Sequence, residues 1–236
     1  MLLHGVGVGP ESFAAMAELL EDRHRVVALE RPVGPGGTAL PLPLQADLLA
    51  TLLAEVGALG ARLVGVSGGA TLGLCLGIRH PQTVSALALH EPLVGALAPE
   101  LHSQFQRSAA IASAGEPEAM EVVRAVMGDA TWASLGPEGQ AASSSHAVRW
   151  RGEIAQFAAF DPSVADLTAL RPLPLLVTVG SRSGPERWAA AEQLRRWAAA
   201  DLVEVPGAGN AAQIDAPQAF TEIVTAWQTV PSGGSA

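Results

Sequence analysis

One stretch of the sequence, residues 61–77, restricts the possible folds more than any other. It reads ARLVGVSGGATLGLCLG, in which a short apolar run is typical of a buried strand and the part from Gly69 onwards has helical spacing. Ser67 lies between the two parts, in the pattern Gly-x-Ser-x-Gly. A serine on so tight a strand-to-helix turn adopts strained backbone angles, and the two flanking glycines remove Cβ atoms that would clash there. The pattern therefore predicts a serine hydroxyl raised clear of a sheet, at a helix N-terminus whose amides can face a developing negative charge.

Composition limits the class of protein around that turn. With 236 residues, 49% of them hydrophobic, the chain can bury one substantial core. The net charge of −9 comes from 23 acidic residues against 14 basic ones, all arginine, which argues against nucleic acid or an anionic membrane as a partner. The single cysteine, Cys75, has no partner for an internal disulfide and is expected to be a buried apolar residue. We find no signal peptide pattern and no apolar run long enough to span a bilayer, and we expect a soluble, cytoplasmic protein.

Residues 4–10, HGVGVGP, follow the short strand predicted at residues 1–3 and allow two interpretations. One is a dinucleotide-binding loop, since Glu30 ends the next predicted strand about where a ribose-binding acid would lie. The third glycine comes one position early for that motif, however, and Pro10 follows it. The other is a His-Gly-x-Gly loop that lies beside a Gly-x-Ser-x-Gly turn and supplies a backbone N–H to an oxyanion hole. The serine turn downstream favours the second interpretation.

Together, the serine turn and the His-Gly loop resemble the nucleophile elbow and the oxyanion loop of the α/β-hydrolases. The resemblance extends over residues 2–227. It implies an α/β fold with a parallel sheet of about six strands flanked by helices, a helical cap insertion, and no N-terminal hairpin of the kind with which relatives usually begin. It also implies that the backbone amides of Val6 and Gly68 form the oxyanion hole.

The order of the predicted elements agrees with that fold. Strands are predicted at residues 1–3, 26–30, 61–66, 84–90, 173–179 and 202–205, and helices at 11–22, 44–56, from 69, 119–127, 143–160, 188–199 and 218–230. Residues 98–160 have helical segments without clear strands, as expected for a cap. We therefore divide the chain into a first core part at 1–97, a cap at 98–160, a second core part at 161–230, and a tail at 231–236.

The chain departs from the family at two positions of the catalytic triad. The family's acid commonly lies in a Gly-x-x-Asp pattern after the strand at 173–179, where this sequence has Ser183 instead. Some relatives carry the acid in a Glu-Pro pair after an earlier strand, which Glu91 and Pro92 match. The family's histidine follows a Pro-Gly-x-Gly segment, and here residues 206–209 lead to Asn210. Because a carboxamide does not take up a proton at neutral pH, the ordinary acyl-enzyme route requires another base.

Three histidines, His90, His146 and His102, are candidates for a substitute base, and each has an ordinary structural interpretation as well. His90 adjoins Glu91 at a strand end, although alternating side-chain directions place the two on opposite sides unless the chain bends there. His146 lies in the predicted cap. No group of residues has metal-ligand spacing, so we expect neither a metal nor a cofactor.

Three functions remain open from the sequence. The first is an enzyme acting on a small, largely apolar carbonyl compound by non-hydrolytic chemistry such as cyclisation, elimination or isomerisation, with Ser67, Glu91 and Asn210 in its site. The second is a serine ester, lactone or thioester hydrolase with a substitute base, or one inactivated by replacement of a histidine at position 210. The third is a non-catalytic small-molecule binding protein. The sequence does not indicate the oligomeric state.

Overall fold

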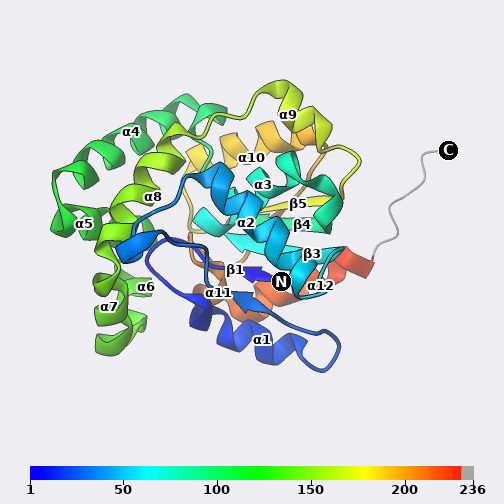
Figure 1. Cartoon of the computed structure of the whole chain (residues 1–236), viewed down its shortest axis with the longest axis horizontal. Coiled ribbons are helices and arrows are strands. Elements are labelled where there is room, and N and C mark those ends of the chain that lie inside the picture. The colour runs from blue at the N-terminus through cyan, green and yellow to red at the C-terminus, as the bar shows by residue number, and fades with distance from the viewer. Residues whose placement is uncertain (230–236) are drawn as a thin grey trace.

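The computed structural model describes residues 1–229, which form a six-stranded parallel sheet with helices on both faces (Figure 1). The strands are β1 (Leu2–Leu3), β2 (Ala28–Leu29), β3 (Ala61–Val66), β4 (Val84–His90), β5 (Leu175–Gly180) and β6 (Asp201–Val205), in the spatial order β2-β1-β3-β4-β5-β6. Strands β3 and β4 are neighbours at the centre, and Val66 pairs with His90 at their carboxyl ends. The predicted α/β class and the parallel sheet are confirmed.

Side chains that alternate along the central strands supply a core on each face of the sheet. On one face, Leu63, Leu87 and Val177 pack with α2 (Leu42–Glu55), α3 (Gly68–Arg79) and α10 (Pro185–Ala198). On the other face, Val64, Val66 and Leu176 pack with α1 (Ala14–Leu20) and α12 (Pro217–Thr229). Because both faces are covered, the central strands are mostly apolar and buried, as in other parallel sheets, whereas the edge strand β6 carries the exposed Asp201 and Glu204. The sheet is therefore a rigid support for whatever its strand ends carry.

A helical insert separates β4 from β5 and adds a layer beside the sheet (Figure 1). It consists of α4 (Pro99–Ala114), α5 (Glu116–Met127), α6 (Asp129–Ser134), α7 (Gly136–Ser145) and α8 (Ala147–Ala159), and is followed by α9 (Val164–Ala169). A short helix, α11 (Ala212–Asp215), precedes α12. Since β3 and β4 both end near the insert's apolar side chains, the insert encloses the space above Ser67.

The observed elements differ from the predicted ones mainly at their ends. The helix predicted at 11–22 begins with a 3-10 turn, Pro10–Phe13, and the strand predicted at 26–30 has only two residues. The single helix predicted at 143–160 is wrong, because the chain forms α7 and α8 with a break at His146. There, the indole N–H of Trp150 donates to the carbonyl oxygen of Ser143 at 2.8 Å, and the hydroxyl of Ser145 donates to that of Ala142 at 2.7 Å. Side chains that bond to helix carbonyls in this way compete with the backbone ladder.

Three further expectations concern membrane-spanning helices, the cysteine and the tail. None of the helices within residues 1–229 has the length and apolar character needed to cross a membrane. Cys75 is buried in α3, and burial raises the pKa of its thiol to about 11. The tail predicted at 231–236 lies outside the described residues.

Candidate active site

Ser67 occupies the turn between β3 and α3 with strained backbone angles, φ 53° and ψ −118°. The flanking glycines are required by close approach. A Cβ on Gly65 would lie 2.7 Å from the Cα of Ala70, and one on Gly69 would lie 2.2 Å from the carbonyl oxygen of Leu3. A nucleophile elbow has this geometry: its serine lies at the end of a central strand, with backbone angles that few residues adopt. The turn predicted from the sequence is therefore present in the structure.

The loop that follows β1 passes directly beside Ser67. A Cβ on Gly5 would lie 3.1 Å from the Cβ of Ser67 and 3.7 Å from its Oγ. Gly68 is the first residue of α3, so its N–H has no carbonyl partner within the helix. A Cβ on Gly68 would lie 3.2 Å from the Cγ2 atom of Val6, which places the two residues next to each other. The geometry is compatible with Val6 and Gly68 as a pair of oxyanion donors.

Glu91 is the first residue after β4, and its backbone is strained, with φ 46°. The side chain is 1% exposed. Its Oε1 atom accepts from the N–H of Gly180 at 3.0 Å and from the hydroxyl of Ser183. Ser183 occupies the position where the Gly-x-x-Asp pattern has its carboxylate, so in this chain the carboxylate reaches that place from the neighbouring strand.

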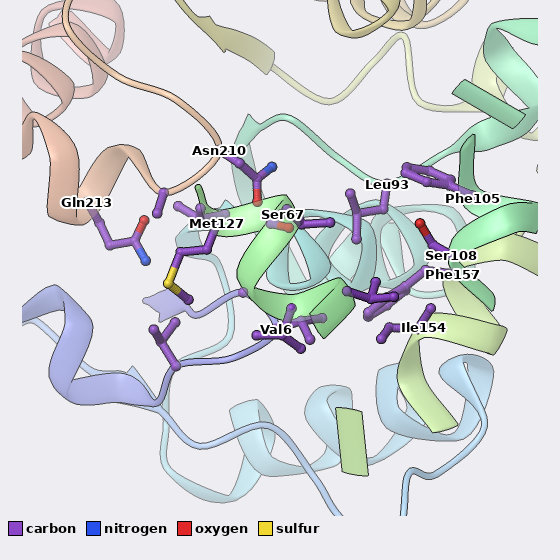
Figure 2. A pocket seen from close by; sticks show the side chains of 17 residues that line it. Val6, Ser67, Leu93, Phe105, Ser108, Met127, Ile154, Phe157, Asn210 and Gln213 are labelled. Atoms are coloured by element: carbon purple, nitrogen blue, oxygen red, sulfur yellow. The ribbon is translucent and has the colours of Figure 1, made fainter. Parts of the chain in front are cut away.

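Asn210 completes this arrangement, because its Nδ2 atom donates to the Oε2 atom of Glu91 at 3.0 Å. The loop that carries it, after β6, is fixed by Asp215. The carboxylate of Asp215 accepts from the N–H of Gly209 at 2.8 Å and pairs with Arg182 at 2.6 Å. A carboxylate without a proton only accepts hydrogen bonds, so the contact with Glu91 fixes which side of the amide carries the N–H groups. Figure 2 shows the other side, the carbonyl oxygen of Asn210, turned towards Ser67.

Glu91 is ionised in this setting. Burial alone would raise the pKa of its carboxyl, but electrostatic interactions with His90 and Arg187 and the hydrogen bonds from Ser183 and Asn210 hold that pKa below its ordinary value. The guanidinium of Arg187 lies 3.9 Å from Glu91. The pair of Glu91 and Asn210 is therefore a buried negative charge with an oriented amide in front of it.

The inner cavity, as we name the space beside Ser67, is apolar and small. About 50 Å³ is open to the centre of a water-sized sphere, against about 10–15 Å³ needed for one water molecule. Its walls come from the loop after β1, the insert, and the loop after β6 (Figure 2). The polar side chains among its lining residues are Ser67, Ser108, Asn210 and Gln213, and all four are neutral. Within the described part of the chain, no titratable side chain lines this cavity.

A wider outer groove lies on the other side of Asn210. About 620 Å³ of it is open to such a sphere, and Glu91, Arg182 and Arg187 contribute to its lining. Asn210, Met127 and Ser108 line both spaces, so they form the boundary between them. The outer groove therefore adjoins the inner cavity.

None of the three candidate histidines lines the inner cavity, and His102 is exposed in α4. The ring of His90 is fully buried, with Nε2 2.8 Å from the carbonyl oxygen of Gly209 and Nδ1 2.9 Å from the hydroxyl of Thr178. Since a carbonyl only accepts, Nε2 carries the proton and Nδ1 accepts from Thr178, which leaves no free lone pair. Burial is the main cause that lowers the pKa of His90. His146 is exposed and lines a different hollow, beside Gly7.

A buried ion cluster that sequence reasoning missed ties the insert to the loop after β1. Arg31 donates to both carboxylate oxygens of Glu153, at 2.9 and 2.8 Å, and to the carbonyl oxygen of Gly5 at 3.2 Å. Arg149 donates to Glu153 at 2.9 Å and also pairs with Glu30. Burial favours the neutral form of Glu30, but hydrogen bonds from His4 and Arg149 outweigh it and lower the pKa of Glu30 to about 2. Gly5 is the residue against Ser67, so the cluster supports the site directly.

The sequence also missed two residues beside the site and did not rank the insert's aromatic residues. Arg187 and Gln213 are polar, buried and close to the site, but nothing in the spacing of the sequence distinguishes them. Of the large apolar side chains of the insert, Phe105, Met127 and Phe157 line the inner cavity, whereas Trp132 and Trp150 pack elsewhere. Within residues 1–229, no three side chains of His, Cys, Asp or Glu are grouped so as to hold a metal ion.

The sheet order, the elbow at Ser67 and the adjoining loop define an α/β-hydrolase fold. The sequence model described as the alpha/beta hydrolase family matches residues 1–223, and the chain belongs to that family. A search of curated proteins found no match to the sequence.

Solved structures with the same fold are distant in sequence. A hydrolase from Pseudomonas aeruginosa PA01 superposes with a TM-score of 0.76 and 21% identity, over 97% of this chain and 89% of the other. The carboxylesterase CesB from Bacillus subtilis gives 0.73 and 18%, over 97% and 82%. The enol-lactonase from Burkholderia xenovorans LB400 gives 0.69 and 21%, over 97% and 90%. At such low sequence identities, these superpositions establish a shared fold alone.

Proposed function

We propose that this protein is an enzyme that binds a small, largely apolar carbonyl compound in the inner cavity and transforms it without forming an acyl-serine. The reaction is of the cyclisation, elimination or isomerisation class. The cavity is small and its walls are mostly aliphatic and aromatic, which matches a ligand of few atoms with little charge.

One observation carries the proposal: within the described chain, Ser67 shares its cavity with no side chain that takes up a proton at neutral pH. In the family, a histidine performs that role, and here Asn210 bonds to the acid instead. In a serine protease, loss of the base lowers turnover by about a millionfold, on the order of 8 kcal/mol of barrier. A chemistry that depends on the Ser67 alkoxide is therefore disfavoured by about that amount.

The remaining groups suit chemistry in which a carbonyl is polarised and the skeleton is held in one conformation. The amides of Val6 and Gly68 would donate to the carbonyl oxygen, where negative charge develops. The hydroxyl of Ser67 has its proton available as a donor, and the carbonyl oxygen of Asn210 offers an acceptor. Holding reacting atoms in the right geometry is by itself worth several kcal/mol of barrier. A rearrangement whose proton transfers stay within the substrate needs nothing more from the protein.

A second candidate is hydrolysis of an ester, lactone or thioester. It is favoured by the intact elbow and by the hydrolytic names of structural neighbours, among them the carboxylesterase and the enol-lactonase. It requires a base that reaches Ser67 from outside the inner cavity, or a natural histidine at position 210. The third candidate, a binding protein without turnover, uses the same cavity and makes no demand on Ser67.

Replacement of Asn210 by histidine separates these candidates. The Asn210→His variant should place an imidazole between Glu91 and Ser67, and we expect it to gain labelling by a fluorophosphonate at Ser67 and hydrolysis of 4-nitrophenyl acetate. The unaltered protein should be labelled at Ser67 only slowly at neutral pH and should hydrolyse the ester no faster than a Ser67→Ala control. Rapid labelling and ester turnover by the unaltered protein would establish the hydrolase instead. No gain in the variant, with its fold intact by circular dichroism, would mean that Ser67, Glu91 and the oxyanion amides are not in catalytic register.

A further inference from the structure

One polar side chain of the inner cavity, Gln213, is not used by the chemistry proposed above. It lies in α11, three residues after Asn210, and is 1% exposed. Its Nε2 atom donates to the hydroxyl oxygen of Ser12 at 3.4 Å. Its Oε1 atom has no hydrogen-bond partner in the part of the chain that the structure describes.

The network around Ser12 determines which end of the Gln213 amide is free. The hydroxyl of Ser12 gives its proton to the carbonyl oxygen of Gly9, at 2.7 Å. The oxygen of Ser12 is then left to accept, and only the N–H side of the amide donates to it. A flipped amide would put two acceptors against each other. The free group of Gln213 is therefore the carbonyl, a hydrogen-bond acceptor.

No hydrogen-bond donor within the described residues reaches this carbonyl. Figure 2 shows the amide of Gln213 directed into the cavity, with the side chain of Met127 beside it. Met127 and Val8 belong to one apolar cluster, and both line the cavity with Gln213. A thioether is a weak acceptor and donates no hydrogen bond, so Met127 leaves the carbonyl unsatisfied. It is also a flexible side chain that moves aside at little cost.

Most buried polar groups in native proteins have a partner. Several buried side-chain atoms within residues 1–229 lack one, and among them the Oε1 atom of Gln213 is the one that belongs to a residue lining the inner cavity. The cost of burying such a group in the free protein is recovered when a ligand brings a donor to it. A ligand without a donor at this point leaves the carbonyl unsatisfied and therefore binds more weakly. A site that hydrogen-bonds its ligand discriminates in this way more strongly than an apolar pocket does.

We propose that the side-chain carbonyl of Gln213 determines specificity by selecting ligands that carry a hydroxyl or N–H group on the skeleton away from the carbonyl held at Ser67. The inference rests on the proposed function, since it takes the bound ligand to be a small carbonyl compound. It narrows the substrate class to hydroxylated or amino-bearing carbonyl compounds. Gln213 touches the ligand at a distance from the reacting carbonyl, so it acts on binding and orientation.

Matched ketones test this directly, because a methyl group and a hydroxyl have similar size. The test uses 4-hydroxybutan-2-one against pentan-2-one, 5-hydroxypentan-2-one against hexan-2-one, and 6-hydroxyhexan-2-one against heptan-2-one. Dissociation constants come from ¹H–¹⁵N NMR titration of the full chain. We expect the hydroxyketone to bind about 3- to 10-fold more tightly than its methyl partner in at least one pair.

Variants assign that preference to one atom. Gln213→Met keeps the length of the side chain and removes the carbonyl, so the preference should disappear, with methyl ketone binding retained. Gln218→Met, an exposed glutamine of α12, is the matched control and should leave the preference unchanged. A thermal melt of Gln213→Met close to that of the unaltered protein verifies that the variant folds.

The outcomes separate the inference from the function on which it rests. Equal binding of the hydroxy and methyl ketones in every pair, or a preference that survives Gln213→Met, would overturn the role of Gln213 and leave the proposed function standing. Resonances near Ser67 that respond to no ketone would overturn both.

Discussion

The buried carboxylate of Glu153 should be among the most important single groups for the stability of this protein. It accepts three charged hydrogen bonds, two from Arg31 at 2.9 and 2.8 Å and one from Arg149 at 2.9 Å, and neither Glu153 nor Arg31 is more than 1% exposed. The cluster of Arg31, Arg149, Glu153 and Glu30 is neutral overall, two charges of each sign. Glu153→Gln keeps the shape and leaves one positive charge without compensation in the interior.

Removing one partner of a buried pair costs about 3–5 kcal/mol. For a chain of this size, each kcal/mol lowers the melting temperature by about 2–4 °C, so we expect a decrease of about 6–20 °C. Thermal and urea unfolding at pH 7, followed by circular dichroism, measure it. Glu138→Gln, an exposed glutamate of the same insert, is the control and should change the free energy of unfolding by less than about 0.5 kcal/mol.

A paired replacement tests the reason for the loss. Arg31→Met with Glu153→Met removes one charge of each sign and leaves the cluster neutral, so the double variant should be less destabilised than Glu153→Gln alone. The reasoning is refuted if Glu153→Gln costs less than about 1 kcal/mol, or if the double variant is the less stable of the two.

Three further predictions concern the elbow, the loop after β6 and the response to acid. Gly69→Ala puts a Cβ 2.2 Å from the carbonyl oxygen of Leu3 and should cost at least about 2 kcal/mol in urea unfolding; an unchanged midpoint would contradict the close approach. Asp215→Asn, made in the Asn210→His background, should lower ester hydrolysis about 10- to 100-fold, because the loop loses its anchor; equal kcat/KM would show that the anchor is dispensable. The pKa of Glu30 is lowered to about 2 in the folded protein, so its carboxylate contributes fully to stability above the ordinary glutamate pKa of 4.5. The difference in the free energy of unfolding between the unaltered protein and Glu30→Gln should therefore shrink as the pH falls from about 4.5 towards 2. A difference that stays constant over this range would contradict the prediction.

The sequence predicted those parts of the site that depend on local chain geometry. The elbow at Ser67 follows from a strand, a helix and two glycines within one short stretch, so its backbone could be inferred without any distant contact. That Asn210 and Glu91 lie together in the site could also be predicted, because each occupies a position of the family's catalytic triad. The identity of the groups was readable, and their orientation was not.

The parts that the sequence did not predict depend on distant partners. His90 was a reasonable base until the structure showed Thr178 and Gly209 holding its two ring nitrogens, from 88 and 119 positions away. Arg31 begins a segment rich in glycine and proline, yet the insert buries it against Glu153. The unpaired carbonyl of Gln213 can be recognised only from the folded structure, by matching each buried acceptor with its donor. Spacing along a chain carries little information about such pairings.

The most direct measurement is the pH dependence of the rate at which a fluorophosphonate labels Ser67 in the unaltered protein, followed by intact mass between pH 5 and 9. If no base lines the cavity, labelling is slow and rises only in proportion to hydroxide concentration, without an inflection near neutral pH. A rapid reaction that reaches a plateau, with an apparent pKa of about 6 to 7.5, would reveal an imidazole acting on Ser67 and would contradict the account.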